Sequence, residues 1–477
     1  MNVLANLEPQ AVFCFFEELC RIPHESGHTK AASDWVVRFA QDRSLRCCQD
    51  TSGNVIIWKP ASPGYESHPA VMLQGHLDMV CVKDPGVEHD FSKDPLDLCV
   101  DGDWIKARGT TLGGDDGIAV AMMLALLDSN TLPHPPVEAV FTVDEEIGLL
   151  GASSLDCSGL KGRLLINLDS EAEGVLTVGC AGGARCDLKL PLPSENAEGK
   201  TCTLSLSGLP GGHSGAEIHK NIANANRVLA KCLSGLPGLQ LISLYGGEQD
   251  NAIPDRAEAQ FVLPEDQLET ASAEINRIYH QEKAAHSDAP NAACSFTWAS
   301  HAPVTALSKE DSRKAIDLIL SAPNGVQAMD PDLPGQVRTS LNLGILRLED
   351  GELRLTWSVR SSVGAEKEAL VQKLKALADT SGASFSRRGD YPAWEFRKES
   401  VLRDTMVRVF EAQYGKTPVV ETIHAGLECG LLAEKLPGLD AVSVGPDLMD
   451  IHSPRERMSV SSVQRTWKYL LAVLAEL

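Results

Sequence analysis

Residues 70–78 read AVMLQGHLD, in which four apolar residues are followed closely by His76 and Asp78. The apolar run predicts a buried strand that ends near His76. Ligands bind outside the carboxyl ends of strands in open α/β sheets, and strand residues two positions apart share a face. We therefore expect both side chains to point the same way, with Asp78 fixing the tautomer of a metal-binding imidazole. Taken alone, the motif also fits a histidine that is only hydrogen-bonded within the fold.

Apolar segments on either side of this stretch alternate with helical patterns. We expect strands at residues 54–58, 137–143, 163–168 and 439–444, and helices at residues 9–46 (with a break at 22–24), 118–127 and 401–414. Nearly continuous apolar strands that alternate with helices indicate a mostly parallel sheet covered on both faces. The sequence therefore predicts a three-layer α/β domain.

A different pattern occupies the middle of the chain, beginning at the glycine-rich residues 178–184. Alternating strands are expected at residues 201–207, 257–262, 340–346 and 353–359, with amphipathic helices at 221–233 and 265–282. The first pattern returns near residues 388–394. We therefore expect one α/β domain, residues 1–183 and 392–477, interrupted by an inserted α+β domain, residues 184–391.

The composition narrows the class of protein. The chain has 477 residues, 43% of them hydrophobic, and a formal net charge of -22, which argues against nucleic acid and anionic membranes as partners. Its 13 cysteines include no CxxC pair, so neither a disulfide framework nor a zinc knuckle is expected. The N-terminal residues lack the pattern of a signal peptide, and no apolar segment is long enough to span a membrane. We expect a soluble, reduced, cytoplasmic protein.

Potential metal ligands stand at or just after the ends of four of the expected apolar strands. They are His76 with Asp78, Glu145 with Glu146, Asp169, and His452 in the loop after residues 443–445, joined by Asp115 from a glycine-rich loop. Carboxylates gathered in this way repel one another, and their pKa values rise. Two divalent ions would remove that cost.

Two ions that share a carboxylate are a common device for hydrolysis. Imidazole and carboxylate ligands suit Zn²⁺, with Mn²⁺ or Co²⁺ as alternatives. Glu145 and Glu146 are adjacent at a strand end and point in different directions. One of the two can therefore bind metal while the other serves as the general base.

Each of these residues also has an ordinary structural interpretation. Asp115 and Asp116 could cap the helix that begins near Gly117, and Glu145 with Glu146 could form a solvated loop. Asp169 and His452 could each begin a turn. These interpretations require several independent coincidences at the strand ends of one sheet, so we favour a shared metal site.

Several motifs carry a family resemblance. HLD (76–78), GGDDG (113–117), DEEIG (144–148), LDSE (168–171) and HSP (452–454) resemble those of the M20 di-zinc peptidases. GGHSGAEIH (211–219), DNAIP (250–254), PNGV (323–326) and IHAGLECG (423–430) resemble the aminoacyl-histidine dipeptidase branch, which includes cytosolic non-specific dipeptidases and carnosinases. The resemblance covers nearly the whole chain.

The resemblance implies a role for each residue of the cluster. His76 and Asp169 would bind one zinc ion, Glu146 and His452 the other, and Asp115 would bridge the two. Asp78 would orient His76, and Glu145 would act as general base on the bridging water. Many relatives carry Asn at the position of Asp116 and Thr or Ser at that of Asp144, so these extra carboxylates could alter the metal preference.

The inserted segment would be the lid and dimerisation domain of the family. His213 would stabilise the developing oxyanion, with His219 as the competing candidate, and the histidine could act within its own subunit or in a partner's. Arg360 would bind a terminal carboxylate. Further candidates for substrate contact are His424, Glu428 and Asn251.

The function implied is metal-dependent hydrolysis of small dipeptides, especially aminoacyl-histidine dipeptides, by a homodimer. The same machinery could act on N-acyl amino acids as an amidohydrolase. A di-metal phosphoesterase is disfavoured because the glycine-rich loop carries acids instead of Lys or Arg. A non-enzymatic metal- or peptide-binding descendant is disfavoured because every expected ligand and the general base are present.

Overall fold

The computed structural model describes residues 3–286, 289–299 and 304–477. The chain divides into two compact units. Unit 1 consists of Met1–Cys180, Phe396–Thr422 and Leu427–Leu477, and unit 2 of Ala181–Glu395 and Ile423–Gly426. The sequence places the corresponding boundaries at 183/184 and 391/392.

Unit 1 is built on an eight-stranded sheet. In spatial order its strands are β1 (Arg46–Gln49), β2 (Val55–Lys59), β6 (Val137–Thr142), β3 (Val71–His76), β7 (Leu164–Asn167), β23 (Asp440–Ser443), β8 (Val175–Cys180) and β22 (Val419–Ile423). The four central strands, β6, β3, β7 and β23, run parallel to one another, whereas β1, β2 and β8 pair antiparallel with their neighbours. The predicted α/β class is confirmed.

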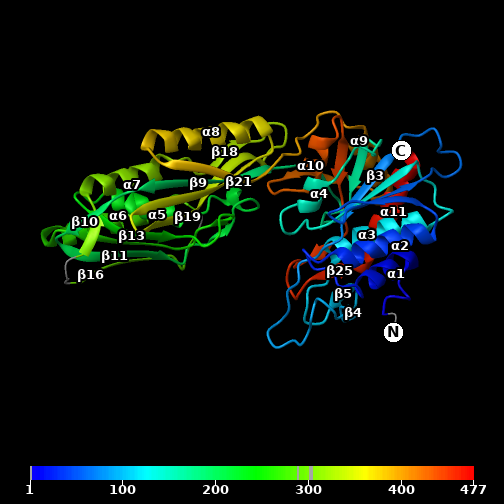
Figure 1. Ribbon diagram of the computed structural model, residues 1–477, viewed down its shortest axis with the longest axis horizontal. Coiled ribbons are helices and arrows are strands. Elements are labelled where there is room, and N and C mark those ends of the chain that lie inside the picture. The colour runs from blue at the N-terminus through cyan, green and yellow to red at the C-terminus, as the bar shows by residue number, and fades with distance from the viewer. Residues whose placement is uncertain (1–2, 287–288, 300–303) are drawn as a thin grey trace. The chain divides into compact units, whose positions relative to one another are not determined.

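Helices cover this sheet (Figure 1). They are α1 (Gln10–Leu19), α2 (Lys30–Asp42), α3 (Gly114–Asp128), α4 (Leu150–Ser154), α9 (Val401–Tyr414), α10 (Glu428–Lys435) and α11 (Val460–Glu476). Val71 and Leu73 of β3 belong to the same buried core as apolar residues of α1, α3 and α11. Gln74 points to the opposite face, where it hydrogen-bonds Glu428 at the start of α10. The alternation along β3 therefore assigns His76 to the α10 face.

Gly75 allows α3 to lie close against β3. A Cβ atom at this position would lie 2.5 Å from Oδ2 of Asp116 and 2.7 Å from Cβ of Ala119. The peptide N–H of His76 donates to the same Asp116 oxygen at 3.1 Å. A side chain at position 75 would displace the turn that carries Asp115.

A small antiparallel sheet completes unit 1. Its strands, in spatial order, are β24 (Leu448–Met449), β25 (Arg457–Ser459), β5 (Trp104–Ala107) and β4 (Leu98–Asp101). Because β24 and β25 flank the loop that contains His452, this sheet anchors both ends of that loop.

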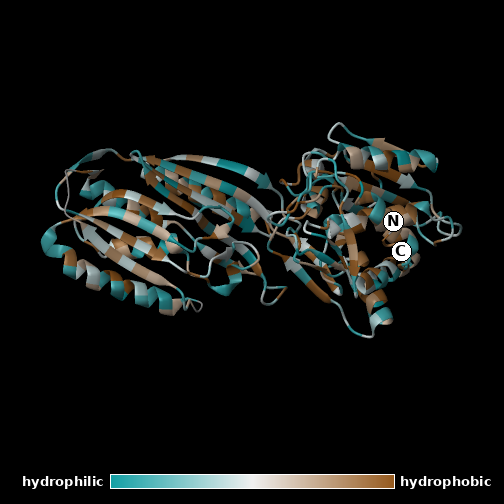
Figure 2. Ribbon diagram, turned by 90° about the horizontal axis from the view of Figure 1, so that it is seen from below, coloured by the Kyte–Doolittle hydropathy of each residue, from teal (hydrophilic) through white to brown (hydrophobic). Residues whose placement is uncertain are grey.

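Unit 2 is an antiparallel sheet with helices. The strands, in spatial order, are β16 (Ala293–Ala299), β11 (Lys200–Ser207), β15 (Ala257–Leu263), β13 (Gln240–Gly246), β19 (Val337–Glu349), β20 (Glu352–Ser361), β9 (Gly182–Pro191) and β21 (Ser384–Tyr391), with β18 (Gly325–Met329) paired to β19. Hydrophobic and hydrophilic residues alternate along these strands (Figure 2). The apolar face packs against α5 (Ala225–Ser234), α6 (Leu268–Ala285), α7 (Lys309–Ser321) and α8 (Gly364–Ser381).

Two short strand pairs lie outside the large sheet of unit 2. β10 (Ser194–Ala197) pairs with β17 (Val304–Leu307), and β12 (Gly212–His213) pairs with β14 (Ala252–Ile253). The second pair places the predicted site residues His213 and Asn251 on neighbouring segments. Among the described residues, no helix is both long and apolar enough to cross a membrane.

Leu73→Ala should reveal how far unit 1 depends on the core below β3. Leu73 has no exposed surface, so truncation leaves a cavity, and we expect the unfolding free energy to fall by about 2–5 kcal/mol. Leu150→Ala is the matched control, because Leu150 is 51% exposed and its loss should cost less than about 0.5 kcal/mol. Urea unfolding of both variants measures the difference, and equal losses would contradict the packing described here.

Candidate functional site

The polar residues predicted from the sequence lie at the carboxyl ends of the central strands of unit 1. His76 is the last residue of β3, and Glu145 and Glu146 follow β6, which ends at Thr142. Asp169 lies two residues beyond the end of β7. Parallel strands bring these ends to one edge of the sheet, as the alternation of strands and helices predicts.

Asp115 lies between the two histidines. Its Oδ1 is 3.1 Å from Nε2 of His76, and its Oδ2 is 3.2 Å from Nε2 of His452. His452 also lies 2.7 Å from Oε1 of Glu146, and His76 lies 3.8 Å from Oδ1 of Asp169. The two oxygens of one carboxylate therefore face two different imidazole nitrogens.

Among the described residues, three overlapping groups of side chains have ligand atoms close enough to hold a cation. Within each group the atoms lie within 4.8 Å of one another; the groups are Asp115, Glu146 and His452; His76, Asp116 and Asp169; and His76, Glu145 and Glu146. All five ligands expected from the sequence occur in these groups. Asp116 is an additional member that was expected only as a departure from the family pattern.

Asp78 organises both sides of this cluster. Its carbonyl oxygen is 3.0 Å from Nδ1 of His76, so Nδ1 carries the proton and Nε2 is left to face the cluster. Its carboxylate accepts hydrogen bonds from the backbone N–H groups of Glu145 at 3.0 Å and Glu146 at 3.2 Å, and from the Ser26 hydroxyl at 2.8 Å. One buried residue thus positions His76 through its backbone carbonyl and the two glutamates through its carboxylate.

Two residues of the site adopt left-handed backbone conformations. Asp144 has a φ of 56° and His452 a φ of 58°, which non-glycine residues rarely adopt. Asp144 accepts a hydrogen bond from the N–H of Gly27 at 2.7 Å. Such conformations persist only where the surrounding structure enforces them, and they concentrate at functional sites.

The cluster contains more negative charge than its histidines balance. Burial, together with neighbouring acids, raises the pKa values of Asp116 and Asp169 well above their usual range and that of Glu145 to about 8. Burial opposes a charged His76, but hydrogen bonds to Asp115 and Asp78 raise the pKa of its imidazole. Positive charge is therefore favoured at this edge of the sheet, and a divalent cation between these ligands would supply it.

The two imidazoles and three carboxylates fit a pair of divalent cations. Nε2 of each histidine faces the cluster, and the Asp115 oxygens are directed to both. Nitrogen and oxygen donors of this kind suit Zn²⁺, Mn²⁺ or Co²⁺. The donor set alone does not select among these metals.

A buried polar layer lies on the α10 face of the sheet. Glu428 has no exposed surface, and its Oε2 accepts hydrogen bonds from Gln74 at 2.5 Å and Thr142 at 2.6 Å. Gln74 in turn accepts a hydrogen bond from Asn167 at 2.7 Å. Glu428 therefore links β3 and β6 through Oε2, and its buried Oε1 has no partner in the described part of the chain.

Unit 2 gathers three of the predicted residues around Gly215. A Cβ atom built on Gly215 would lie 2.5 Å from the carbonyl oxygen of His424, 3.0 Å from Cε1 of His213 and 3.3 Å from Nε of Arg360. Arg360 is only 8% exposed, and its Nε has no hydrogen-bond partner in the described part of the chain. Its guanidinium donates to the Tyr391 hydroxyl at 3.1 Å. Arg360 therefore has a buried Nε donor without a partner in the described part of the chain.

Backbone hydrogen bonds place Asn251 close to His213. Its carbonyl accepts a hydrogen bond from the N–H of Ser214 at 2.8 Å, and β12 pairs with β14 on either side. The N–H of Ala216 donates to Nδ1 of His213 at 3.1 Å, so that nitrogen is unprotonated and Nε2 carries the proton. His213 can therefore donate a hydrogen bond through Nε2.

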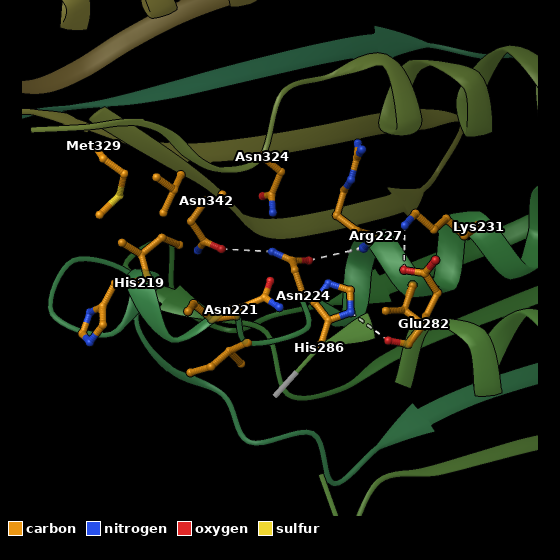
Figure 3. Close-up of a pocket in the computed structure, with 16 residues that line it drawn as sticks. His219, Asn221, Asn224, Arg227, Lys231, Glu282, His286, Asn324, Met329 and Asn342 are labelled. Atoms are coloured by element: carbon orange, nitrogen blue, oxygen red, sulfur yellow. Dashed lines mark hydrogen bonds and ion pairs between the residues drawn. The ribbon is translucent and has the colours of Figure 1, made fainter. Parts of the chain in front are cut away.

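His219 lies elsewhere in unit 2. It lines a separate cavity of about 520 Å³ beside α5, shown in Figure 3. The polar groups of that cavity are paired with one another: Lys231 with Glu282 at 2.6 Å, and Asn224 with Asn342 at 3.0 Å. Because these polar side chains bond one another, we assign them a structural role in the cavity wall.

Two residues of the site were not expected from the sequence. Glu456 contacts the turn that carries Asp115, and Tyr391 contacts Arg360. Glu456 follows His452 by four residues, but nothing in a single glutamate indicates a partner more than 300 residues away. Tyr391 lies in residues 388–394, which the sequence indicated only as the place where the alternation of helices and apolar strands resumes.

Comparisons with known proteins identify the family of this chain. Residues 72–476 match the model of peptidase family M20/M25/M40. The cytosol non-specific dipeptidase of Escherichia coli is 36% identical over 482 residues, covering 100% of this chain and 99% of that protein.

Solved structures give the same result. The aminoacylhistidine dipeptidase of Vibrio alginolyticus superposes with a TM-score of 0.94 at 34% identity, covering 99% of this chain and 98% of that one. The aminopeptidase PepT of Bacillus cereus has a TM-score of 0.57 at 17% identity, covering 98% and 99%. The second likeness extends to the fold alone.

His424→Gln should flatten the dependence of stability on pH. Burial, reinforced by the charge of Arg360, lowers the pKa of His424 to about 3, while its Nε2 lies 2.7 Å from the Ser340 hydroxyl. Below about pH 6.5 the His424 imidazole is protonated in the unfolded chain but stays neutral in the folded chain. The free energy of unfolding therefore falls as the pH drops from about 6.5 toward 3.

Urea unfolding at pH 7.5 and pH 5.0 measures this effect. Between these values the native chain should lose up to about 2 kcal/mol more than His424→Gln, since one pKa unit corresponds to about 1.4 kcal/mol. An identical pH dependence in both proteins would show that His424 does not stay neutral in the fold.

Proposed function

This chain belongs to peptidase family M20/M25/M40, and on that premise we propose that it is a metal-dependent dipeptidase acting on unblocked dipeptides, including aminoacyl-histidine dipeptides. The position of Asp115 carries the proposal, because its two oxygens face the Nε2 atoms of His76 and His452. The names of the E. coli and Vibrio alginolyticus relatives support the substrate class.

The cluster would hold two divalent cations. His76 and Asp169 are assigned to one ion, Glu146 and His452 to the other, and Asp115 to both. Zn²⁺ is the metal we propose, with Mn²⁺ and Co²⁺ as alternatives for the same ligands. When bound, such a pair polarises the scissile carbonyl and makes a water molecule more acidic.

Glu145 is proposed as the general base. It takes a proton from the attacking water and passes it to the leaving amine. Burial raises its pKa to about 8, with Glu428 and Glu146 adding to the effect, and cations at the neighbouring ligands would lower that pKa and favour the carboxylate that accepts a proton. Asp78 supports this step, because it holds the backbone of Glu145 and the ring of His76 with one carboxylate.

The residues around Gly215 are proposed to bind the substrate. Arg360 would bind the terminal carboxylate through its unpaired guanidinium edge, and His213 would donate to the developing oxyanion through Nε2. His424 and Asn251 are secondary candidates for contact. The pairing of His213 with Ala252, the residue after Asn251, favours His213 over His219 for this role.

Unit 2 is proposed as the lid of the enzyme, with residues 184–391 as its main part and as the site of dimerisation. A lid that closes over a short substrate excludes water from the reaction. We further propose a cytoplasmic homodimer. The name of the E. coli relative supports the compartment.

Glu145→Gln should abolish turnover and keep the metal. The amide cannot accept the proton, so kcat should fall by at least about 100-fold, while the number of bound ions per chain is unchanged. The exposed Glu18→Gln serves as control and should retain full activity. Steady-state kinetics with elemental analysis measures both quantities, and undiminished kcat in Glu145→Gln would remove the residue from this role.

Removing the metal should stop hydrolysis, and restoring it should recover activity. Chelator-treated enzyme given Zn²⁺, Mn²⁺ or Co²⁺ should release histidine from beta-alanyl-histidine or glycyl-histidine. N-acetylated forms of the same dipeptides should react more slowly, since a dipeptidase recognises the free amino group. Hydrolysis of the acetylated forms at equal or higher rates would instead identify an N-acyl-amino-acid amidohydrolase, and no hydrolysis with any of these metals would refute the proposal.

A further inference from the structure

Glu456 binds the turn that carries Asp115. The Glu456 side chain is only 3% exposed, and its carboxylate accepts hydrogen bonds from four consecutive backbone N–H groups. Oε2 accepts from Leu112 at 2.7 Å and Gly113 at 3.1 Å, and Oε1 accepts from Gly114 at 2.8 Å and Asp115 at 3.4 Å. Both oxygens are therefore occupied by this one turn.

The turn needs such a partner because its backbone is irregular. Gly113 has a φ of 68°, and Asp115 and Asp116 depart from helical dihedral angles before α3 becomes regular. N–H groups in an irregular turn have no helical carbonyl to bind, and leaving them buried and unpaired is costly. The Glu456 carboxylate satisfies them and is itself compensated by four donors.

Glu456 also belongs to the loop that carries His452. Its own N–H donates to the carbonyl of Ser453 at 3.0 Å, which closes a tight turn directly after His452. The imidazole of His452 meets Oδ2 of Asp115 at 3.2 Å. One side chain thus connects the backbone of two loops whose functional side chains converge.

We propose that Glu456 is a positioning residue that fixes Asp115 relative to His452 and thereby sets the affinity of the site for a divalent cation. The identity of the ligand rests on the proposed function, whereas the connection between the loops does not. Glu456 itself is bonded to the backbone and binds no metal. Groups that orient metal ligands in this way typically contribute 10- to 100-fold to metal affinity.

Two variants separate positioning from a general contribution to stability. Glu456→Gln keeps the size of the side chain, but its amide nitrogen cannot accept and so removes two of the four hydrogen bonds. Glu138→Gln is the matched control in unit 1. Glu138 is also 3% exposed and accepts backbone N–H bonds, from Lys161 and Gly162, but it lies near the start of β6, four residues and roughly 13 Å of strand before Thr142.

The test is titration of the metal-free full-length chain with Co²⁺, followed by its visible absorption. Glu456→Gln should weaken Co²⁺ binding by at least about tenfold and alter the spectrum of the bound ion. Glu138→Gln should lower the melting temperature but leave Co²⁺ affinity within about twofold of the native chain. Unchanged Co²⁺ affinity in Glu456→Gln, or equal losses in both variants, would overturn the proposal.

Hydrogen exchange provides a second test that requires no variant. In the metal-free native chain, the amides of residues 112–115 should be protected, because their bonds to Glu456 do not depend on a metal. Exchange as fast as that of an exposed loop would overturn the proposal even if Glu456→Gln failed to fold. Loss of Co²⁺ affinity in Glu456→Gln supports it whether or not the chain hydrolyses a dipeptide, so this inference and the proposed function fail separately.

Discussion

Electrostatic repulsion among buried carboxylates is the constraint on which unit 1 depends. Asp115, Glu145 and Asp169 converge at one edge of a sheet, and the two histidines do not balance them. The surrounding structure limits the cost by giving other acids fixed partners: Asp78 accepts backbone N–H groups from the glutamate turn, and Glu456 accepts them from the Asp115 turn. Burial raises the pKa values of Glu145 and Asp169, and a cation would stabilise both carboxylates.

In this fold the regular strands and the metal-ligand side chains have separate tasks. The parallel strands set where the ligands emerge, and short irregular turns set how they point. Gly75 lets α3 approach β3, and the left-handed conformation of His452 turns its ring toward Asp115. Buried carboxylates hold two of these turns: Asp78 holds the turn of Glu145 and Glu146, and Glu456 holds the turn of Asp115. This explains why the functional side chains can lie on loops and still be precisely arranged.

Much of this could be predicted from local sequence. The run before His76 predicted a buried strand, the period of two assigned His76 and Asp78 to one face, and the strand ends predicted which acids would meet. Contacts between segments far apart in the sequence could not be predicted from local patterns. Glu456 and Leu112 are separated by 344 positions, and no local period marks either. His213, Arg360 and His424 likewise lie around Gly215 although they are far apart in the sequence, and no local pattern marks that approach. Glu428 is buried because α10 packs against the sheet. The motif IHAGLECG, interpreted from the sequence as a loop, did not indicate this packing.

The account as a whole depends on Asp115 serving two cations at once. Anomalous diffraction at the zinc absorption edge, from crystals grown with Zn²⁺, tests this most directly. We expect two peaks roughly 3.5–4 Å apart, each about 2.0–2.2 Å from a different oxygen of Asp115. One peak beside His76 and the other beside His452 would complete the arrangement. A single peak, or two peaks of which only one contacts Asp115, would contradict it.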